Sequence, residues 1–154
     1  MNERRLLRGL TRRQALASLG AATVLGGCSM IKGGASHPRY AASPKQLTDG
    51  TLRVPIKQMA FPEDGVVLID PGGGYAKVLV RRDPDGSYGV ADANCTHMGC
   101  ILGWDASRKE WSCPCHGSRF ATDGTVRSGP AKRPLPIPAH HMEGDLLVIE
   151  LNKA

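Results

Sequence analysis

Two short segments of this 154-residue chain contain most of its candidate metal ligands: CTHMGC at residues 95–100 and CPCHGS at residues 113–118. In each segment a cysteine and a histidine stand two or three positions apart, close to a glycine. Together the segments contain four of the five cysteines and two of the five histidines. Because two thiolates and two imidazoles can form a metal site, we expect the two segments to meet in the folded chain, with one further cysteine in each.

The formal net charge of +6 comes mainly from the N-terminal residues. Five of the 20 Lys and Arg residues precede Cys28, and Glu3 is the only acidic residue there. From Cys28 onward, 15 basic residues stand against 13 acidic ones, a net charge of +2. The nearly neutral remainder predicts no phosphate-binding surface and therefore no nucleic-acid partner. The length fits one domain with an additional tail.

The first 28 residues have the pattern of an export signal. Arg12 and Arg13 stand next to each other directly before an apolar run at residues 15–25, which resembles a twin-arginine signal. That export route carries folded proteins, as a chain that receives a metal cofactor in the cytoplasm requires. A generic basic leader is the alternative interpretation.

The sequence LGGC at residues 25–28 resembles a bacterial lipobox, which predicts cleavage before Cys28 and a lipid on its sulfur. The alternative is an uncleaved membrane anchor at residues 14–31, although a spanning helix needs about 20 predominantly apolar residues and glycines dilute this stretch. A lipobox also explains the odd fifth cysteine. In either case we expect an exported domain that is tethered to the membrane and faces the periplasm or the outer side.

Residues 29–50 are rich in Gly, Ser, Ala and Pro and predict a flexible tether. From residue 51 to residue 154, short apolar runs alternate with turn residues and predict one all-β domain of small antiparallel sheets. No helical period and no internal repeat occurs after the leader. The expected strands lie at residues 52–56, 66–69, 75–82, 87–93, 101–104, 109–112, 119–121, 137–142 and 146–151.

The residues of the two segments alone leave three interpretations open. The cysteines could form only disulfides, for which three pairings exist, and the histidines would then be incidental. A structural zinc site would use two cysteines and two histidines, and would leave Cys100 and Cys115 without a role at the metal. A mixed-ligand iron–sulfur cluster would place two thiolates on one iron and two imidazoles on the other.

The two segments resemble the C-T-H-x-G-C and C-P-C-H-G-S signature of Rieske [2Fe–2S] proteins, which is a highly specific pair of motifs. The resemblance covers roughly residues 75–138 and includes the sequence SGPA at residues 128–131, which is similar to the Gly-Pro loop of that family at Gly129 and Pro130. It implies a Rieske-type fold with a two-loop tip that holds one [2Fe–2S] cluster.

By this resemblance, the ligands are Cys95 and Cys113 on one iron and His97 and His116 on the other. The resemblance also implies a disulfide between Cys100 and Cys115 that ties the two loops together. Such a bond needs an oxidising compartment, in agreement with the export signal. Rieske ferredoxins of cytosolic oxygenases usually lack this second cysteine pair, which makes that class a poor match.

Four further positions are expected to tune the cluster. Gly99 and Gly117 allow backbone amides to approach the sulfurs, and these hydrogen bonds favour the reduced state. In high-potential relatives a serine and a tyrosine donate to sulfur; Ser118 is present here, but Phe120 occupies the tyrosine position. We therefore expect an intermediate potential, suited to menaquinol better than to ubiquinol. The alternative is that Phe120 only packs the core.

The resemblance implies electron transfer as the Rieske subunit of a bacterial quinol–cytochrome c reductase of the bc type, not an autonomous enzyme. Its partners would be the membrane, a quinol, cytochrome b and cytochrome c, with His116 as the quinol contact. Two alternatives are the Rieske small subunit of a periplasmic molybdenum enzyme resembling arsenite oxidase and a stand-alone exported electron carrier. His140 and His141 lie outside the motif and are expected to be surface or core residues.

Overall fold

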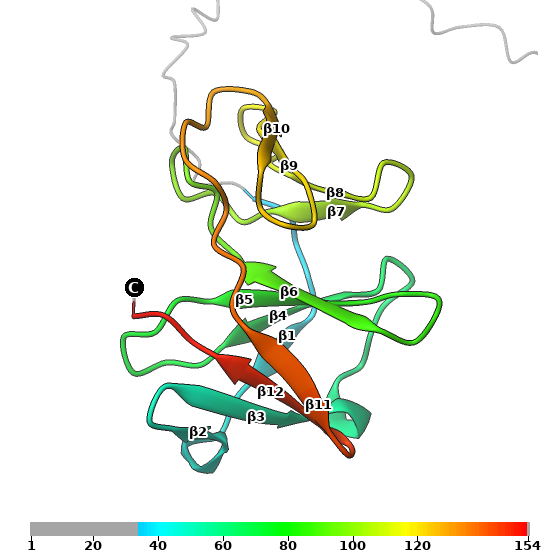
Figure 1. Cartoon of the computed structure of the whole chain (residues 1–154), viewed down its shortest axis with the longest axis vertical. Helices are drawn as coiled ribbons and strands as arrows, with labels where there is room; N and C mark the ends of the chain where they lie inside the picture. The colour runs from blue at the N-terminus through cyan, green and yellow to red at the C-terminus, as the bar shows by residue number, and fades with distance from the viewer. Residues whose placement is uncertain (1–33, 154) are drawn as a thin grey trace, which may run out of the picture.

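The computed structural model describes residues 34–153, so the predicted export signal, with Arg12, Arg13 and Cys28, lies outside the described residues. Within that range the chain forms twelve strands and two single turns of 3-10 helix. The strands form three stacked four-stranded sheets (Figure 1). The predicted all-β class of small antiparallel sheets is confirmed. Among residues 34–153 there is no helix whose length and apolarity would suit a membrane crossing.

The central sheet has the strand order β1-β4-β5-β6. Its strands are β1 (Arg39–Ala41), β4 (Val66–Asp70), β5 (Val78–Arg82) and β6 (Tyr88–Asp92). The pairs β4–β5 and β5–β6 are antiparallel, whereas β1 runs parallel to β4. Successive side chains of a strand point to opposite faces, so a sheet with neighbours on both sides needs apolar residues at every position. This explains why all four residues of the 66–69 run are buried.

The lower sheet has the order β11-β12-β3-β2 and closes one face of the central sheet. Its strands are β2 (Leu47–Thr48), β3 (Thr51–Pro55), β11 (His140–Glu143) and β12 (Leu146–Glu150), with the 3-10 turns η1 (Pro44–Gln46) and η2 (Ile56–Gln58) beside them. The core between these two sheets is built from fully buried side chains, among them Leu52, Val54, Leu147 and Ile149. This two-sheet sandwich is the base of the domain.

The upper sheet has the order β10-β9-β8-β7 and covers the other face of the central sheet. Its strands are β7 (Gly103–Asp105), β8 (Glu110–Ser112), β9 (Arg119–Phe120) and β10 (Val126–Ser128). We call residues 94–136, which include this sheet and both cysteine–histidine loops, the upper subdomain. Its core contains Leu102, Trp111 and Phe120 together with Cys95 and Cys113.

A buried arginine joins the central sheet to the upper sheet. Arg81 on β5 is 8% exposed, and its guanidinium carbon lies 3.9 Å from the centroid of the Trp104 ring. Its Nη2 atom donates to Asp83 Oδ2 at 2.5 Å. On the neighbouring strand, Gly89 leaves the space that the guanidinium fills, because a Cβ there would lie 2.9 Å from Nη2. A cation over an indole ring is a favourable contact, and it is stronger when it is desolvated.

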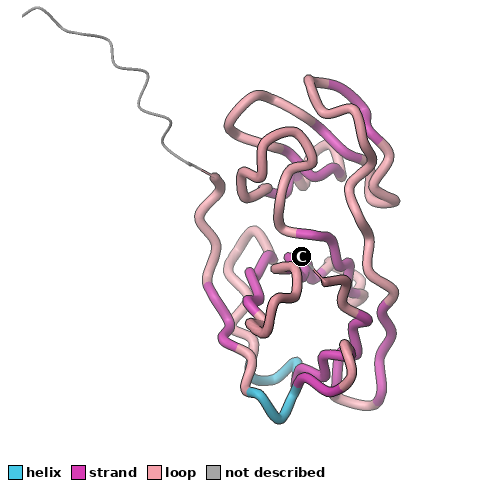
Figure 2. Tube along the Cα trace, turned by 90° about the vertical axis from the view of Figure 1, so that its left-hand side faces the viewer, coloured by secondary structure: helices cyan, strands magenta, loops and turns pink. Residues whose placement is uncertain are grey.

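The domain begins earlier in the chain than the sequence predicts. Residues 34–50, expected as part of a flexible tether, run along the side of the molecule from the upper subdomain to the base (Figure 2). The amide of Ala35 donates to Ile101 O at 3.0 Å, and the amide of Leu68 donates to Pro38 O at 2.9 Å. β1 and β2 then join the sheets. The sequence did not predict these strands, because β1 joins a sheet edge through its backbone while its side chains stay exposed or half-buried and show no apolar pattern.

Candidate metal centre

The two cysteine–histidine loops have the same backbone geometry. In each loop the first cysteine amide donates to the carbonyl five residues later, and the glycine amide donates back to the cysteine carbonyl. These four bonds are Cys95 to Cys100 (2.8 Å), Gly99 to Cys95 (2.8 Å), Cys113 to Ser118 (2.8 Å) and Gly117 to Cys113 (3.0 Å). The glycines have φ values of +75° and +73°, a region that favours glycine. Their own amides are therefore occupied within the loops, and the amides that face a sulfur belong to other residues.

Two free thiols lie together beneath the loops. Cys95 and Cys113 are each 3% exposed, and they are the free cysteines of residues 34–153. Burial raises the pKa of the Cys113 thiol, while the backbone N–H groups of Cys115 and His116 favour its thiolate. The Cys95 side chain also lies within hydrogen-bonding reach of Cys113. A pair of buried thiols with N–H donors aimed at one sulfur suits a metal, which binds the thiolate form.

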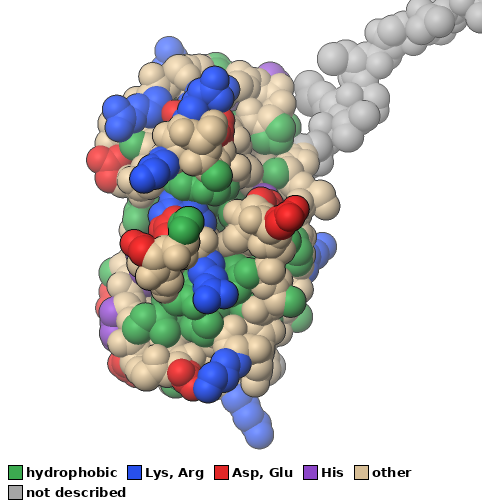
Figure 3. All heavy atoms as spheres, turned by 90° about the vertical axis from the view of Figure 1, so that its right-hand side faces the viewer, with side chains coloured by type: hydrophobic (Ala, Val, Ile, Leu, Met, Phe, Trp, Pro, Cys, Tyr) green, Lys and Arg blue, Asp and Glu red, His purple; other side chains and the backbone are tan. Residues whose placement is uncertain are grey.

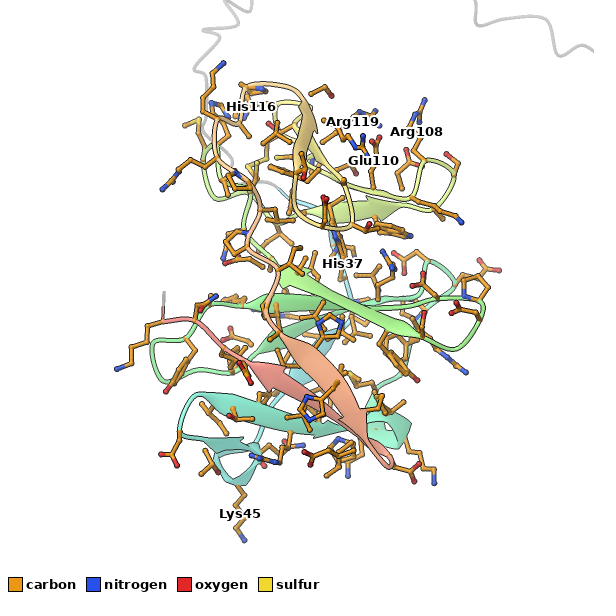
Figure 4. The ribbon with its side chains drawn as sticks, in the orientation of Figure 1. His37, Lys45, Arg108, Glu110, His116 and Arg119 are labelled. Carbon is orange, nitrogen blue, oxygen red and sulfur yellow. A yellow bond between two sulfur atoms is a disulfide. The ribbon has the colours of Figure 1, made fainter. Side chains whose placement is uncertain are left out.

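Two imidazoles lie beside each other at the surface of the same loops. The ring centroids of His97 and His116 are 4.9 Å apart, and the ring planes are perpendicular. Both residues are exposed, and His116 lies at the upper end of the molecule (Figure 4). The four predicted ligands therefore come together as two inner thiols and two outer imidazoles.

A disulfide joins the two loops, as the family resemblance implies. Cys100 and Cys115 are bonded, with their Cα atoms 6.5 Å apart. Their sulfurs and the Cys113 sulfur all lie within 4.8 Å of one another, so the disulfide lies directly beside the thiol pair. The bond closes a 15-residue loop, for which the chain-entropy estimate is about 3 kcal/mol. The interpretation that all four cysteines form disulfides is wrong, because Cys95 and Cys113 are free.

The loop that contains Gly129 and Pro130 packs against the second cysteine–histidine loop. Gly129 has a φ of +90°, and a Cβ on it would lie 2.5 Å from the Ser118 Cα atom, so only glycine fits. Ser118 is fully buried, and its Oγ atom accepts a hydrogen bond from the Ala131 amide at 3.1 Å. That bond uses a lone pair and leaves the hydroxyl hydrogen available to a further acceptor.

The same loop also holds the first cysteine–histidine loop. Thr96 Oγ1 donates to Arg133 O at 2.7 Å, across 37 residues of sequence. Sequence reasoning missed this contact, and the only signal for it was the hydroxyl residue between Cys95 and His97. One connecting segment therefore clamps both loops.

Phe120 is fully buried in the core of the upper subdomain. It is in register with Trp111 on β8 and Val126 on β10. It shares this core with Cys113. The packing role considered for Phe120 is thus confirmed, while its effect on the potential stays a prediction. His140 is half-buried and His141 is exposed, as expected for residues outside the site.

Fold and site together define an iron–sulfur protein of the mixed Cys/His class, and comparison with known proteins agrees. The sequence pattern of the Rieske [2Fe-2S] domain matches residues 46–139. The chain therefore belongs to the Rieske [2Fe–2S] family. Members hold a [2Fe–2S] cluster with two cysteine and two histidine ligands, and the chain carries this cofactor type rather than structural zinc.

Individual relatives extend the comparison. Cytochrome b6-f complex iron-sulfur subunit 3 of Nostoc sp. is 32% identical over 143 residues, which cover 83% of this chain and 78% of that protein. A Rieske 2Fe-2S iron-sulfur protein of Bacillus subtilis is 41% identical over 97 residues, 59% of this chain, and the chain spans only 18% of its length. The ferredoxin of carbazole 1,9a-dioxygenase from Nocardioides aromaticivorans has the same fold, with a TM-score of 0.54 and 22% identity over 66% of this chain and 97% of that one.

Proposed function

We propose that Cys95 and Cys113 hold one iron and His97 and His116 the other, and that the chain is the electron-transfer subunit of a quinol–cytochrome c reductase of the bc type. The observation that carries this proposal is the exposed pair of imidazoles directly above a buried pair of free thiols. The likeness to the cytochrome b6-f subunit of Nostoc, which extends over most of both chains, supports the choice of complex.

The two kinds of ligand have different tasks. When bound, the cluster supplies one-electron chemistry at potentials of roughly −150 to +300 mV. Buried Cys95 and Cys113 keep water away from the sulfur side of the site. The exposed ring of His116 can accept a hydrogen bond from a quinol hydroxyl at the ring nitrogen that does not face the metal, and can take up the quinol proton there.

Ser118 and Phe120 set the electrostatics around the sulfurs. The free hydroxyl hydrogen of Ser118 can donate to a cluster sulfur and favour the reduced state, whereas the Phe120 ring has no donor. We expect an intermediate potential and a menaquinol donor. Gly99 and Gly117 contribute indirectly, because they adopt the positive φ values that the two tight loops require, while the amides that act on Cys113 are those of Cys115 and His116.

The chain acts outside the cytoplasm in this proposal. The disulfide between Cys100 and Cys115 supports such a location, because structural disulfides persist in oxidising compartments. Export would depend on Arg12 and Arg13, and attachment to the membrane on a lipid at Cys28.

The test compares wild-type and His116→Ala chains in cells that lack the chromosomal copy. Membranes with the wild-type chain should show quinol–cytochrome c reductase activity and a reduced electron paramagnetic resonance signal of the mixed-ligand type. His116→Ala should lose both. Affinity purification of the wild-type chain should recover a cytochrome b; recovery of a large molybdopterin subunit instead would refute the bc-type assignment and identify the alternative complex.

A further inference from the structure

Charge is divided unequally between the two halves of the folded chain. Residues 94–136, the upper subdomain, carry six basic and three acidic residues, a net charge of +3. The other described residues, 34–93 and 137–153, carry eight basic and ten acidic residues, a net charge of −2. On the face drawn in Figure 3, Lys and Arg side chains lie over the upper subdomain and also over the sheets below it, with Asp and Glu side chains among them. The positive half is the one that presents the two exposed histidines.

Two of the six basic side chains are neutralised within the upper subdomain. Arg108 Nη1 lies 2.9 Å from Asp105 Oδ2, and Arg119 pairs with Glu110 and, at 3.6 Å, with Asp105. These residues lie together at the β7–β8 side, away from the tip (Figure 4). Their positive charge is therefore compensated locally and leaves little attraction for a partner.

Four other cations remain. Lys109 lies in the turn between β7 and β8. The other three follow one another along the chain: Arg127, Lys132 and Arg133, which we call the basic rim. All three are exposed, and within residues 34–153 none of them forms an ion pair within 4 Å. The carboxylate of Asp123, four residues before Arg127, accepts a hydrogen bond from the Thr125 amide at 2.9 Å and also attracts the Arg127 guanidinium electrostatically. Asp123 therefore partly balances Arg127, whereas no ion pair among residues 34–153 balances Lys132 or Arg133.

The part of the basic rim that contains Lys132 and Arg133 is hydrogen-bonded to both cysteine–histidine loops. The carbonyl of Arg133 is held by Thr96, the neighbour of His97, and the amide of Ala131 is held by Ser118. Lys132 lies between these two anchor points. The backbone that carries Lys132 and Arg133 is therefore held close to the loops of both exposed imidazoles. Met98, which follows His97 in the first cysteine–histidine loop, is 59% exposed and is one of the two large apolar side chains of residues 34–153 that are exposed.

We propose that the basic rim and the tip around Met98 form a docking surface for an acidic face of a redox partner protein; this rests on the proposed electron-transfer function. An apolar centre surrounded by polar residues is the usual anatomy of a protein interface. Positive charge beside the electron-exchanging groups steers an acidic partner into a productive orientation. A membrane surface is a weaker match, because recognition of anionic lipid typically uses clusters of about four to eight basic residues.

The experiment measures second-order rate constants for electron transfer from the reduced, cluster-containing chain to two cytochromes c of similar potential, one acidic and one basic. The rim variant carries Lys132→Glu and Arg133→Glu. The control carries the same change of charge at the lower sheet, Lys45→Glu and Arg53→Glu, both at exposed positions; Lys45 lies at the opposite end of the molecule from His116 (Figure 4). A neutral variant with Gln at positions 132 and 133 guards against misfolding, and the cluster spectrum is recorded for every variant.

At low ionic strength the rim variant should react about tenfold more slowly with the acidic cytochrome, and the neutral variant should be intermediate. The difference should vanish in high salt, since exposed charges are then screened. The basic cytochrome should not be slowed. An unchanged rate, or an equal loss in the control variant, would overturn the docking surface alone.

The two proposals fail in different ways. If the wild-type chain reduces neither cytochrome, both the docking surface and the proposed electron-transfer function are overturned. If the rim variant loses only its binding to vesicles that contain phosphatidylglycerol, with unchanged transfer rates, the rim is a lipid site and the protein-docking proposal is refuted.

Discussion

Replacing Ser118 by alanine isolates one hydrogen bond at the site. The Ser118 side chain is fully buried, and its oxygen accepts from the Ala131 amide, so its hydrogen is free to donate to a cluster sulfur. A bond to a charged acceptor is worth about 1.5–3 kcal/mol, and its strength differs between the two oxidation states by about 1–2 kcal/mol. Since about 1.4 kcal/mol corresponds to about 59 mV for one electron, Ser118→Ala should lower the midpoint potential by about 40–85 mV.

The assay is a redox titration of the purified, cluster-containing chain, followed by electron paramagnetic resonance. The matched control is Ser112→Ala, which removes the half-buried serine hydroxyl that directly precedes Cys113 at the end of β8. The control should leave the potential within a few millivolts of wild type. Ser118→Ala should also lower the free energy of unfolding by about 1–3 kcal/mol, because the Ala131 amide loses its partner. A lowered stability with an unchanged midpoint would refute the assignment of the hydroxyl hydrogen to a sulfur.

Three further changes test neighbouring parts of the structure. Gly129→Ala should lower the free energy of unfolding by about 1–3 kcal/mol because of the φ of +90° alone. Thermal unfolding should show a lower midpoint and an earlier loss of the cluster colour. A midpoint equal to that of wild type would contradict the close approach of this loop to Ser118. Phe120→Tyr should raise the redox midpoint in the same titration, and an unchanged or lower value would remove the tuning argument. For Asp105, hydrogen bonds from Ser107 and then Arg108 hold the carboxyl pKa well below its usual range. The ionised Asp105 carboxylate therefore contributes fully to the stability of the fold above about pH 4, and this contribution is lost as the pH falls further. The thermal midpoints of wild type and Asp105→Asn should differ at neutral pH and converge in acid. A difference that stays constant with pH would contradict this titration.

The parts of the fold that the sequence predicts correctly are those in which side-chain pattern and turn residues agree. The apolar runs at 66–69 and 146–151 predict buried strands, and the turn residues at 83–86 predict the β5–β6 hairpin. β10 and β1 could not be predicted, because most of their side chains are exposed and they join a sheet mainly through backbone hydrogen bonds. For the same reason, the strands at residues 39–41 and 47–48 were not predicted and fell within the expected tether.

Of the site, the sequence predicts which residues are candidate ligands but not the contacts that hold them in place. The two segments name the four ligand candidates by residue type and spacing, and the family resemblance adds the pairing of Cys100 with Cys115. Spacing alone could not choose among the three possible pairings. The contact between Thr96 and Arg133 and the position of Arg81 over Trp104 depend on how separate layers meet, and no local pattern encodes that.

The tip is held by three connections of different chemistry, and each one joins different parts of it. The disulfide links the two cysteine–histidine loops to each other, whereas Gly129 and Thr96 link the 129–133 segment to one loop each. The segment that stiffens the site therefore also carries two of the three cations of the basic rim, Lys132 and Arg133. The same residues hold the ligand loops and position part of the surface charge. The loops can therefore meet a partner protein without changing their own geometry. Electron exchange benefits from such an arrangement, since groups already in position need little reorganisation when the charge changes.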